Sequence, residues 1–303
     1  MPPPNDVSQS VAAYGSAQRD LLLNTDRGRF AARDYGGRGR DVLLVHGTGH
    51  NLAVWTPLVE HLAGAFRLAA FDMRGHGKTE VDSTDAEQYW RDIGTVAAAL
   101  GLERPLLVGH STGAYAVTAY AADGGDCAGV VLLDGFVLDA RKTPEEAAAW
   151  RLSRQALWDE YRYGWAARAE EMEAYVADAR AGAAGSGPNA GLDPVLVEAF
   201  TQRAFLPVGD TYLRRPTLDD LEAVCRCDTS ASIYPAREIY DRLHVPAGFV
   251  LASQGYYAHR RAEVQAVAAQ AANRWYAEID AGHNLHMQKP GELAGLLLEH
   301  FGS

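Results

Sequence analysis

The residues with the clearest potential for chemistry form the pentapeptide Gly-His-Ser-Thr-Gly at positions 109–113. An apolar run at 105–108 precedes it and is typical of a buried strand, and a run of small and apolar residues at 114–122 is typical of a buried helix. In a G-x-S-x-G turn between a strand and a helix, the serine hydroxyl projects above the sheet at a helix N-terminus, where negative charge is stabilised. The pattern predicts that Ser111 is a nucleophile; the alternative is an ordinary Gly/Ser turn.

Two further turns occur in the order and spacing that such a serine turn predicts. An apolar run at 41–45 leads into His-Gly-Thr-Gly-His at 46–50, and another at 68–71 leads into Asp-Met-Arg-Gly-His-Gly at 72–77. Together with the serine turn, these motifs resemble the α/β-hydrolase superfamily. The resemblance implies an α/β class protein with the α/β-hydrolase fold. That fold has a mostly parallel eight-stranded sheet covered by helices, and here a helical cap is expected after strand six.

The hydrophobic pattern along the chain agrees with this architecture. Near-continuous apolar runs alternate with helical segments, as in a parallel sheet that is covered on both faces. The expected strands lie at 21–23, 28–35, 42–45, 68–71, 105–108, 129–133, 245–251 and 274–279. No buried strand is evident from 136 to 240, where the sequence is mostly helical. We therefore expect a flexible arm at 1–16, a core of 17–135 and 241–303, and a helical cap at 136–240.

A serine nucleophile needs a histidine within hydrogen-bond reach, because its hydroxyl is protonated at neutral pH. The superfamily carries this histidine in the loop after strand eight. His283, in Asp-Ala-Gly-His at 280–283, matches that position. His286 lies three residues further on and is the alternative.

The acid of the expected triad departs from the commonest pattern. Most relatives carry an aspartate after strand seven, a position that falls near Gly255 in a segment without an acid. Asp134, at the end of strand six, is then the candidate, because some branches of the superfamily place their acid there, followed closely by an aromatic residue such as Phe136. Many relatives with an acid after strand seven also carry this aspartate, so the assignment depends on the missing alternative. Asp139, Glu263 and a degenerate triad stay open.

The resemblance also implies the groups around the nucleophile. Backbone N–H groups of Thr112 and Thr48 would form the oxyanion hole, the pair of donors that stabilises the tetrahedral intermediate. The residues expected to bind substrate are Gly47, His50, Phe136, Trp158 and His286. The aromatic side chains of the cap either line a substrate pocket or pack the cap onto the core.

No cofactor or metal is expected. His46 and His50 have i, i+4 spacing, but in a glycine-rich loop, and Cys225 and Cys227 have no second pair nearby. The glycine-rich turn at 47–49 lacks the Lys-Ser/Thr of a phosphate-binding loop. The serine at position 111 also excludes the aspartate-based mechanism of dehalogenases and epoxide hydrolases.

Charge and hydropathy limit the partners. The net charge of −11 argues against nucleic acid or an anionic membrane as the main partner. No window approaches the about 18 apolar residues of a membrane span. The polar N-terminus lacks the pattern of a signal peptide, so we expect a cytoplasmic protein. The oligomeric state, including a homodimer, is left open.

These features favour a serine hydrolase that cleaves a carboxylic ester or lactone through an acyl-enzyme. The acid after strand six, the large cap and its aromatic residues resemble capped lactonases of the zearalenone-hydrolase type, so a bulky macrocyclic lactone is one expected substrate. A small-ester carboxylesterase is another reading of the same site. A carbon–carbon bond hydrolase is a further alternative, although such enzymes normally keep their acid after strand seven. A ligand-binding relative with low turnover is the alternative from a different class.

Overall fold

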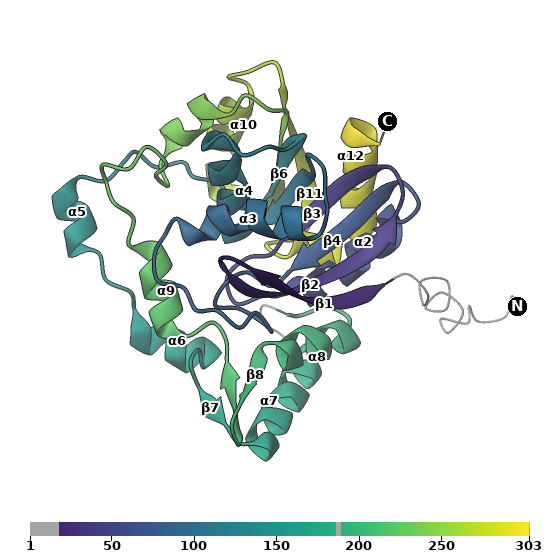
Figure 1. Cartoon of the computed structure of the whole chain (residues 1–303). Helices are drawn as coiled ribbons and strands as arrows, with labels where there is room; N and C mark the ends of the chain where they lie inside the picture. The colour runs from purple at the N-terminus through teal and green to yellow at the C-terminus, as the bar shows by residue number, and fades with distance from the viewer. Residues whose placement is uncertain (1–17, 186–188, 303) are drawn as a thin grey trace, which may run out of the picture.

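The computed structural model describes residues 18–185 and 189–302, so the arm predicted at 1–16 lies outside the described residues. An eight-stranded sheet with the order β1-β2-β4-β3-β5-β6-β10-β11 forms the centre (Figure 1). The pairs β1–β2 and β2–β4 are antiparallel, and the remaining pairs are parallel. The strands are β1 Arg19–Thr25, β2 Gly28–Gly37, β3 Arg40–Val45, β4 Phe66–Phe71, β5 Leu106–His110, β6 Gly129–Leu133, β10 Ala247–Gln254 and β11 Arg274–Gly282.

Helices cover both faces of this sheet because its central strands are apolar on both sides. The helices of the core are η1 Leu52–Trp55, α2 Thr56–Leu62, α3 Gln88–Ala99, α4 Thr112–Ala122, η3 Ala258–Arg260, α10 Arg261–Ala268, α11 Leu285–Gln288 and α12 Pro290–Phe301. Along β3, Leu43 packs into one core cluster with α3, α4 and α10, and Leu44 packs into a second cluster with α2, α11 and α12. The predicted fold class is confirmed.

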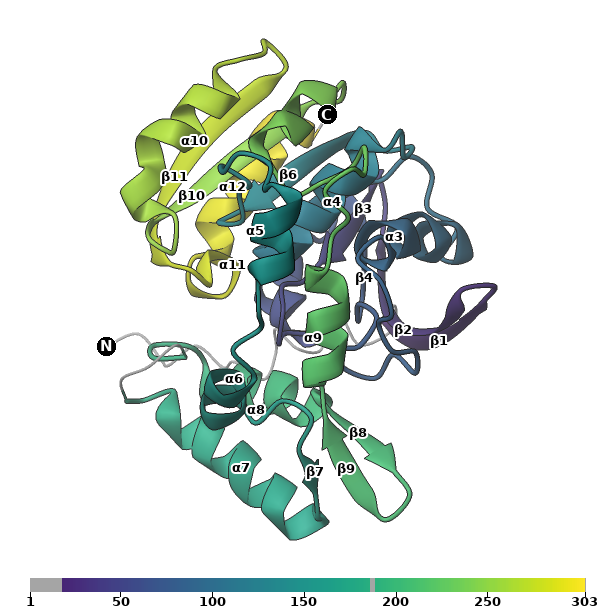
Figure 2. The same ribbon diagram turned by 90° about the vertical axis from the view of Figure 1, so that its left-hand side faces the viewer.

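The segment between β6 and β10 forms an insertion with its own small sheet. Its elements are α5 Pro144–Ala149, α6 Arg154–Tyr161, β7 Ala166–Ala167, α7 Ala169–Gly182, α8 Pro194–Arg203, β8 Phe205–Val208, β9 Thr211–Arg214, α9 Leu218–Cys225 and η2 Arg237–Arg242. In Figure 2, α6, α7, α8 and β7–β9 gather below the main sheet. The strands β7, β9 and β8 pair antiparallel, which the expectation of a helical insertion missed. These strands have only two to four residues and are partly exposed, and β8 contains a proline, so the sequence gives no clear strand pattern there. The domain boundaries themselves stay a prediction.

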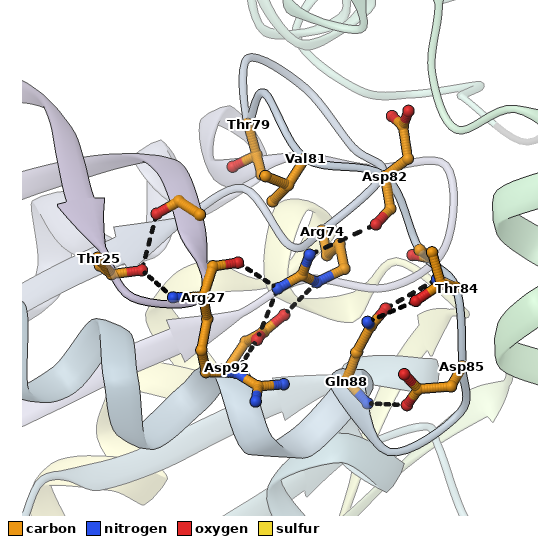
Figure 3. A network of polar contacts seen from close by, with 12 residues as sticks. Thr25, Arg27, Arg74, Thr79, Val81, Asp82, Thr84, Asp85, Gln88 and Asp92 are labelled. Carbon is orange, nitrogen blue, oxygen red and sulfur yellow. Dashed lines mark hydrogen bonds and ion pairs between the residues drawn. The ribbon is translucent and has the colours of Figure 1, made fainter.

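The turn after β4, which carries the Asp-Met-Arg-Gly-His-Gly motif, has a structural role. Arg74 donates through Nε to Asp92 Oδ2 at 2.8 Å and through Nη2 to the backbone carbonyl of Arg27 at 2.7 Å (Figure 3). Arg27 Nε binds the other oxygen of Asp92 at 2.6 Å. Asp92 is buried on α3, so this network joins the β1–β2 turn, the turn after β4 and α3.

None of the helices in the described part of the chain combines the length and apolarity needed to cross a membrane.

Candidate active site

Ser111 occupies a strained turn between β5 and α4. Its φ of 54° and ψ of −120° lie where a non-glycine residue is seldom found, and such strain is common at functional sites. Side chains at the two flanking glycines would collide with backbone: a Cβ on Gly109 with the carbonyl of Gly113, and a Cβ on Gly113 with that of Val45. The glycines of the motif are therefore required by close backbone approach at the end of β5.

Asp134 and His283 are in direct contact. Asp134 follows β6, is fully buried and accepts a hydrogen bond from Nδ1 of His283 through Oδ2 at 2.7 Å. The backbone N–H groups of Tyr256 and Ala252 also donate to this carboxylate, at 3.0 and 3.2 Å. Because an ionised carboxylate only accepts, Nδ1 of His283 carries the proton and Nε2 is left as the acceptor.

Gly255, in the loop after β10, leaves room for the carboxylate of Asp134, which follows β6. A Cβ on Gly255 would collide with the carboxylate of Asp134, so that carboxylate fills the space beside the residue where most relatives carry their acid. The other two candidate acids lie elsewhere. Asp139 and Glu263 both bind the guanidinium of Arg260, each at 2.7 Å.

Ser111 and His283 line the same cavity, of about 620 Å³. Thr48, His50 and His110 contribute to its core side. The ring of Tyr256 stacks on that of His283 with centroids 3.9 Å apart. The insertion supplies the opposite side, with Leu157, Tyr161, Tyr163, Tyr175, Phe200 and Arg214. The cavity thus brings core and insertion residues together around the serine.

Of the five residues expected to bind substrate, only His50 is on the cavity wall. Phe136 is buried in the core, where it packs on Phe249 and Tyr257. Trp158 is half-buried beneath the guanidinium of Arg162 and does not line the cavity.

His286 is fully buried and lies against Trp55 and His110, with centroids 4.7 and 4.3 Å away. Of the other two, His50 lines the cavity. Gly47 lies directly beneath it, where an added Cβ would be 2.8 Å from Cβ of Ser111.

The two expected oxyanion donors lie side by side. Thr112 is the first residue of α4, where backbone N–H groups lack partners within the helix. The N–H of Thr48 donates to the hydroxyl of Thr112 at 2.8 Å, and the two hydroxyl groups are 2.9 Å apart. The hydroxyl of Tyr89 lies 3.3 Å from that of Thr48. The N–H of Thr48 is therefore occupied by a neighbouring hydroxyl in this structure.

A cluster of three histidines lies beside the serine. Potential ligand atoms of His50, His110 and His286 lie within 4.8 Å of one another. Burial lowers the pKa of His50 to about 3 and lowers the pKa values of His110 and His286 well below the ordinary value, so all three are neutral. Neutral imidazoles are the form that binds zinc, and this cluster is where the described residues could hold such an ion. The expected absence of a metal stays a prediction.

Sequence reasoning missed three residues at this site. His110 is the variable residue before the serine, Tyr256 lies in the loop where an acid was sought, and Arg214 ends a short strand of the insertion. No sequence motif distinguishes Tyr256 or Arg214 from the other tyrosines and arginines of the chain.

Comparison with known proteins agrees with this fold. A family model described as the alpha/beta hydrolase fold matches residues 42–174. The crystal structure of E-2-(acetamidomethylene)succinate hydrolase superposes with a TM-score of 0.70 over 94% of this chain and 100% of that chain, at 20% identity. The chain has the alpha/beta hydrolase fold, and its residues 42–174 match the family of that description.

Two curated proteins match part of the chain. Protein phosphatase methylesterase 1 of Mus musculus is 33% identical over 121 residues, which is 36% of this chain and 31% of that protein. The 2-(acetamidomethylene)succinate hydrolase of Mesorhizobium japonicum is 40% identical over 88 residues, or 28% of this chain and 32% of that protein. The matched segments span only about a third of each relative.

Proposed function

We propose that this α/β-hydrolase is a serine hydrolase that cleaves a carboxylic ester or lactone, with Ser111, His283 and Asp134 as its triad. The observation that carries the proposal is the 2.7 Å hydrogen bond from His283 to Asp134, beside a cavity that Ser111 also lines. A carboxylate on Nδ1 holds the imidazole in the tautomer that a serine nucleophile needs.

The reaction would proceed in two halves. The hydroxyl of Ser111 attacks the substrate carbonyl while Nε2 of His283 takes its proton, and the same histidine then protonates the leaving alkoxide. Water activated by His283 attacks the resulting ester on Ser111 and releases the acid. Asp134 remains ionised and stabilises the imidazolium of His283 in both halves.

The oxyanion would be stabilised by the backbone N–H groups of Thr112 and Thr48. The N–H of Thr48 binds the Thr112 hydroxyl at 2.8 Å, so it would exchange this acceptor for the substrate oxygen during the reaction. The Thr112 hydroxyl keeps a partner in that step, because the hydroxyl of Thr48 is 2.9 Å away. The exchange therefore leaves no buried polar group unpaired.

The cavity supports a small-molecule substrate. Its volume of about 620 Å³ is within the usual range of such sites, and tyrosine rings form much of its insertion side. The curated relatives include a protein phosphatase methylesterase, which supports an ester. The Mesorhizobium relative is named for a succinate derivative rather than an ester, so the alternative of a carbon–carbon bond hydrolase belongs in the same substrate screen.

A screen of 4-nitrophenyl esters, simple lactones, macrocyclic lactones and ring-cleavage products with a labile carbon–carbon bond, with the wild-type protein and Ser111→Ala, tests the proposal. We expect hydrolysis of at least one ester or lactone by the wild-type protein and none above background by Ser111→Ala. Equal activity of the two proteins would overturn the assignment of Ser111. Folded wild-type protein that binds these compounds without cleaving any would favour the ligand-binding alternative.

A further inference from the structure

Arg214 is a buried cation in the wall of the active-site cavity. It ends β9, and 7% of its surface is exposed. Its Nε donates to the carbonyl of Tyr161 at 2.8 Å, whereas Nη1 is buried and has no hydrogen-bond partner among the described residues. No carboxylate within the described ranges forms an ion pair with it. A buried charge without a counter-ion is unfavourable unless a ligand supplies one.

The neighbouring arginine shows how this fold otherwise treats a buried guanidinium. Arg215 is 2% exposed and donates to the carbonyl groups of Gly75 and Val81, at 3.0 and 3.2 Å, and to Asp82 Oδ1 at 2.8 Å. Arg214 has only the single carbonyl of Tyr161. The difference between these two consecutive residues is that only Arg214 lines the cavity.

Aromatic rings hold the guanidinium of Arg214 in place. Its central carbon lies 4.8 Å from the ring centre of Tyr175, 5.4 Å from that of Phe205 and 5.8 Å from that of Tyr163. Such contacts stabilise a cation partially and fix its plane, but they leave the outer N–H groups available. A guanidinium that is oriented in advance loses less entropy when it binds a planar carboxylate.

We propose that Arg214 binds a carboxylate of the substrate, so that this enzyme hydrolyses esters or lactones that also carry a free carboxylate. The inference rests on the proposed function and names the substrate class of the same site. Carboxylate and guanidinium match in geometry, because two parallel N–H groups bind the two oxygens.

Tyr163 contacts both Arg214 and the loop that carries the proposed oxyanion donor. Its ring lies beside the guanidinium of Arg214, and its hydroxyl lies against Gly49, where an added Cβ would collide with it. Gly49 follows Thr48, the proposed oxyanion donor. Tyr163 therefore connects the surroundings of Arg214 with the loop of the proposed oxyanion donor, and monoesters of a short dicarboxylic acid are suitable probes of the pair.

Two acidic residues of the cavity would favour a cationic substrate instead of a carboxylate. Glu160 and Asp178 also line the cavity, but both are exposed. Exposed charges are screened by water and salt, whereas a buried guanidinium is not. If the two carboxylates determined specificity instead, the site would prefer cationic esters.

Binding to a protein that cannot turn over tests the inference without relying on catalysis. In the Ser111→Ala background, we would measure the affinity for monomethyl glutarate by calorimetry, with and without Arg214→Gln. The matched control is Arg168→Gln, which removes an exposed arginine of the insertion that is paired with Glu171. We expect Arg214→Gln to weaken binding by about tenfold to a hundredfold, the usual loss for a charged hydrogen bond, and the control to have little effect. Equal affinities in all three proteins would overturn the inference.

Kinetics give a second readout. We would compare kcat/KM for the 4-nitrophenyl monoester of glutaric acid with that for neutral 4-nitrophenyl pentanoate and cationic 4-nitrophenyl 4-aminobutanoate. The wild-type protein should favour the carboxylate ester by about tenfold or more, and Arg214→Gln should remove this preference. Arg214→Lys keeps the positive charge but lacks the planar pair of N–H donors, so it should retain part of the preference for the carboxylate ester. This variant replaces Arg214→Gln in the test if Arg214→Gln does not fold.

Hydrolysis without a preference for the carboxylate ester, or with a preference for the cationic ester, would refute the role of Arg214 while leaving the serine mechanism intact. Failure to hydrolyse any ester, with binding of monomethyl glutarate still dependent on Arg214, would refute the serine mechanism and leave the carboxylate site intact. The two failures are therefore distinguishable.

Discussion

Asp134 and His283 are 149 residues apart in the sequence, and their side chains meet in a 2.7 Å hydrogen bond at the edge of the sheet. Asp134 follows β6, His283 follows β11, and β10 lies between these two strands. The carboxylate reaches the histidine because Gly255, after β10, leaves its own side-chain space empty. A triad with its acid on β6 therefore requires a small residue at position 255.

Asp134→Asn is expected to reduce turnover by about three to four orders of magnitude, because an amide no longer fixes the protonated Nδ1 of His283. The fold should persist, since the amide oxygen can still accept from one of the two backbone N–H groups, of Ala252 and Tyr256, that donate to the two carboxylate oxygens. Ester hydrolysis and circular dichroism measure the two effects. Asp139→Asn is the control, because Asp139 binds the exposed side of Arg260, and it should remain within about twofold of wild type. A larger loss in Asp139→Asn than in Asp134→Asn would move the acid to Asp139.

Gly113→Ala is expected to disrupt the serine turn. The new methyl group would collide with the carbonyl groups of Val45 and His46, so β3 and α4 must separate and Ser111 must move. Overpacking of this kind typically lowers stability by about 1–3 kcal/mol. Gly295→Ala is the matched control, because Gly295 lies in α12 with open space around it, and alanine there should stabilise the helix by up to about 1 kcal/mol. Thermal unfolding of the two variants should move in opposite directions; parallel shifts would show that the turn tolerates a side chain.

Asp72→Asn is expected to lower the free energy of unfolding by about 3 kcal/mol, because it leaves Arg203 without its buried counter-ion. Asp72 is fully buried and accepts from Arg203 Nε at 2.9 Å and from the backbone N–H groups of Leu52 and Lys78 at 2.8 Å each. Arg203 belongs to α8, so this pair links the insertion to the turn after β4.

Asp126→Asn provides the contrast, because its partner Arg104 and Asp126 itself are largely exposed. It should change the free energy of unfolding by less than about 1 kcal/mol in urea denaturation. Similar losses for Asp72→Asn and Asp126→Asn would contradict the importance of the buried pair.

Stability should fall as the pH drops below the ordinary histidine pKa of about 6.5. Burial lowers the pKa values of five histidines, His46, His50, His76, His110 and His286, with that of His50 at about 3. Between these lowered values and 6.5, the unfolded chain takes up protons that the folded protein does not bind. Each such histidine removes up to about 1.4 kcal/mol of stability per pH unit.

Urea denaturation between pH 7 and pH 5 measures this dependence. His286→Gln should reduce the number of protons taken up on unfolding at pH 5 by about one, because His286 is neutral in the folded protein. An unchanged proton uptake in this variant would show that His286 is already protonated in the folded state.

The fold could be predicted from the sequence because its signals are local. Apolar runs such as Val130 to Leu133 indicate buried strands, and close backbone approach requires the glycines around Ser111. The structure has strands at all eight predicted positions. Asp134 could be selected from the absence of an acid near Gly255, although its catalytic role stays a prediction. The strands of the insertion escaped prediction because they are two to four residues long.

The cavity wall could not be predicted, since it depends on which way side chains point after packing. Phe136 follows the acid as expected but turns into the core against Phe249. Tyr163, among the aromatic residues of the insertion, does reach the cavity, whereas Trp158 does not. Arg214 gives no signal in the sequence. It differs from Arg215 in being buried without a carboxylate counter-ion, which only the structure shows.

Labelling with a fluorophosphonate, followed by intact-mass measurement and peptide mapping, tests the central claim most directly. This probe reacts with a serine that a neighbouring base has activated. The account predicts one adduct per chain, located on Ser111, with labelling much slowed in Asp134→Asn. Folded protein that stays unlabelled, or an adduct on a different residue, would contradict the assignment of Ser111 as the nucleophile.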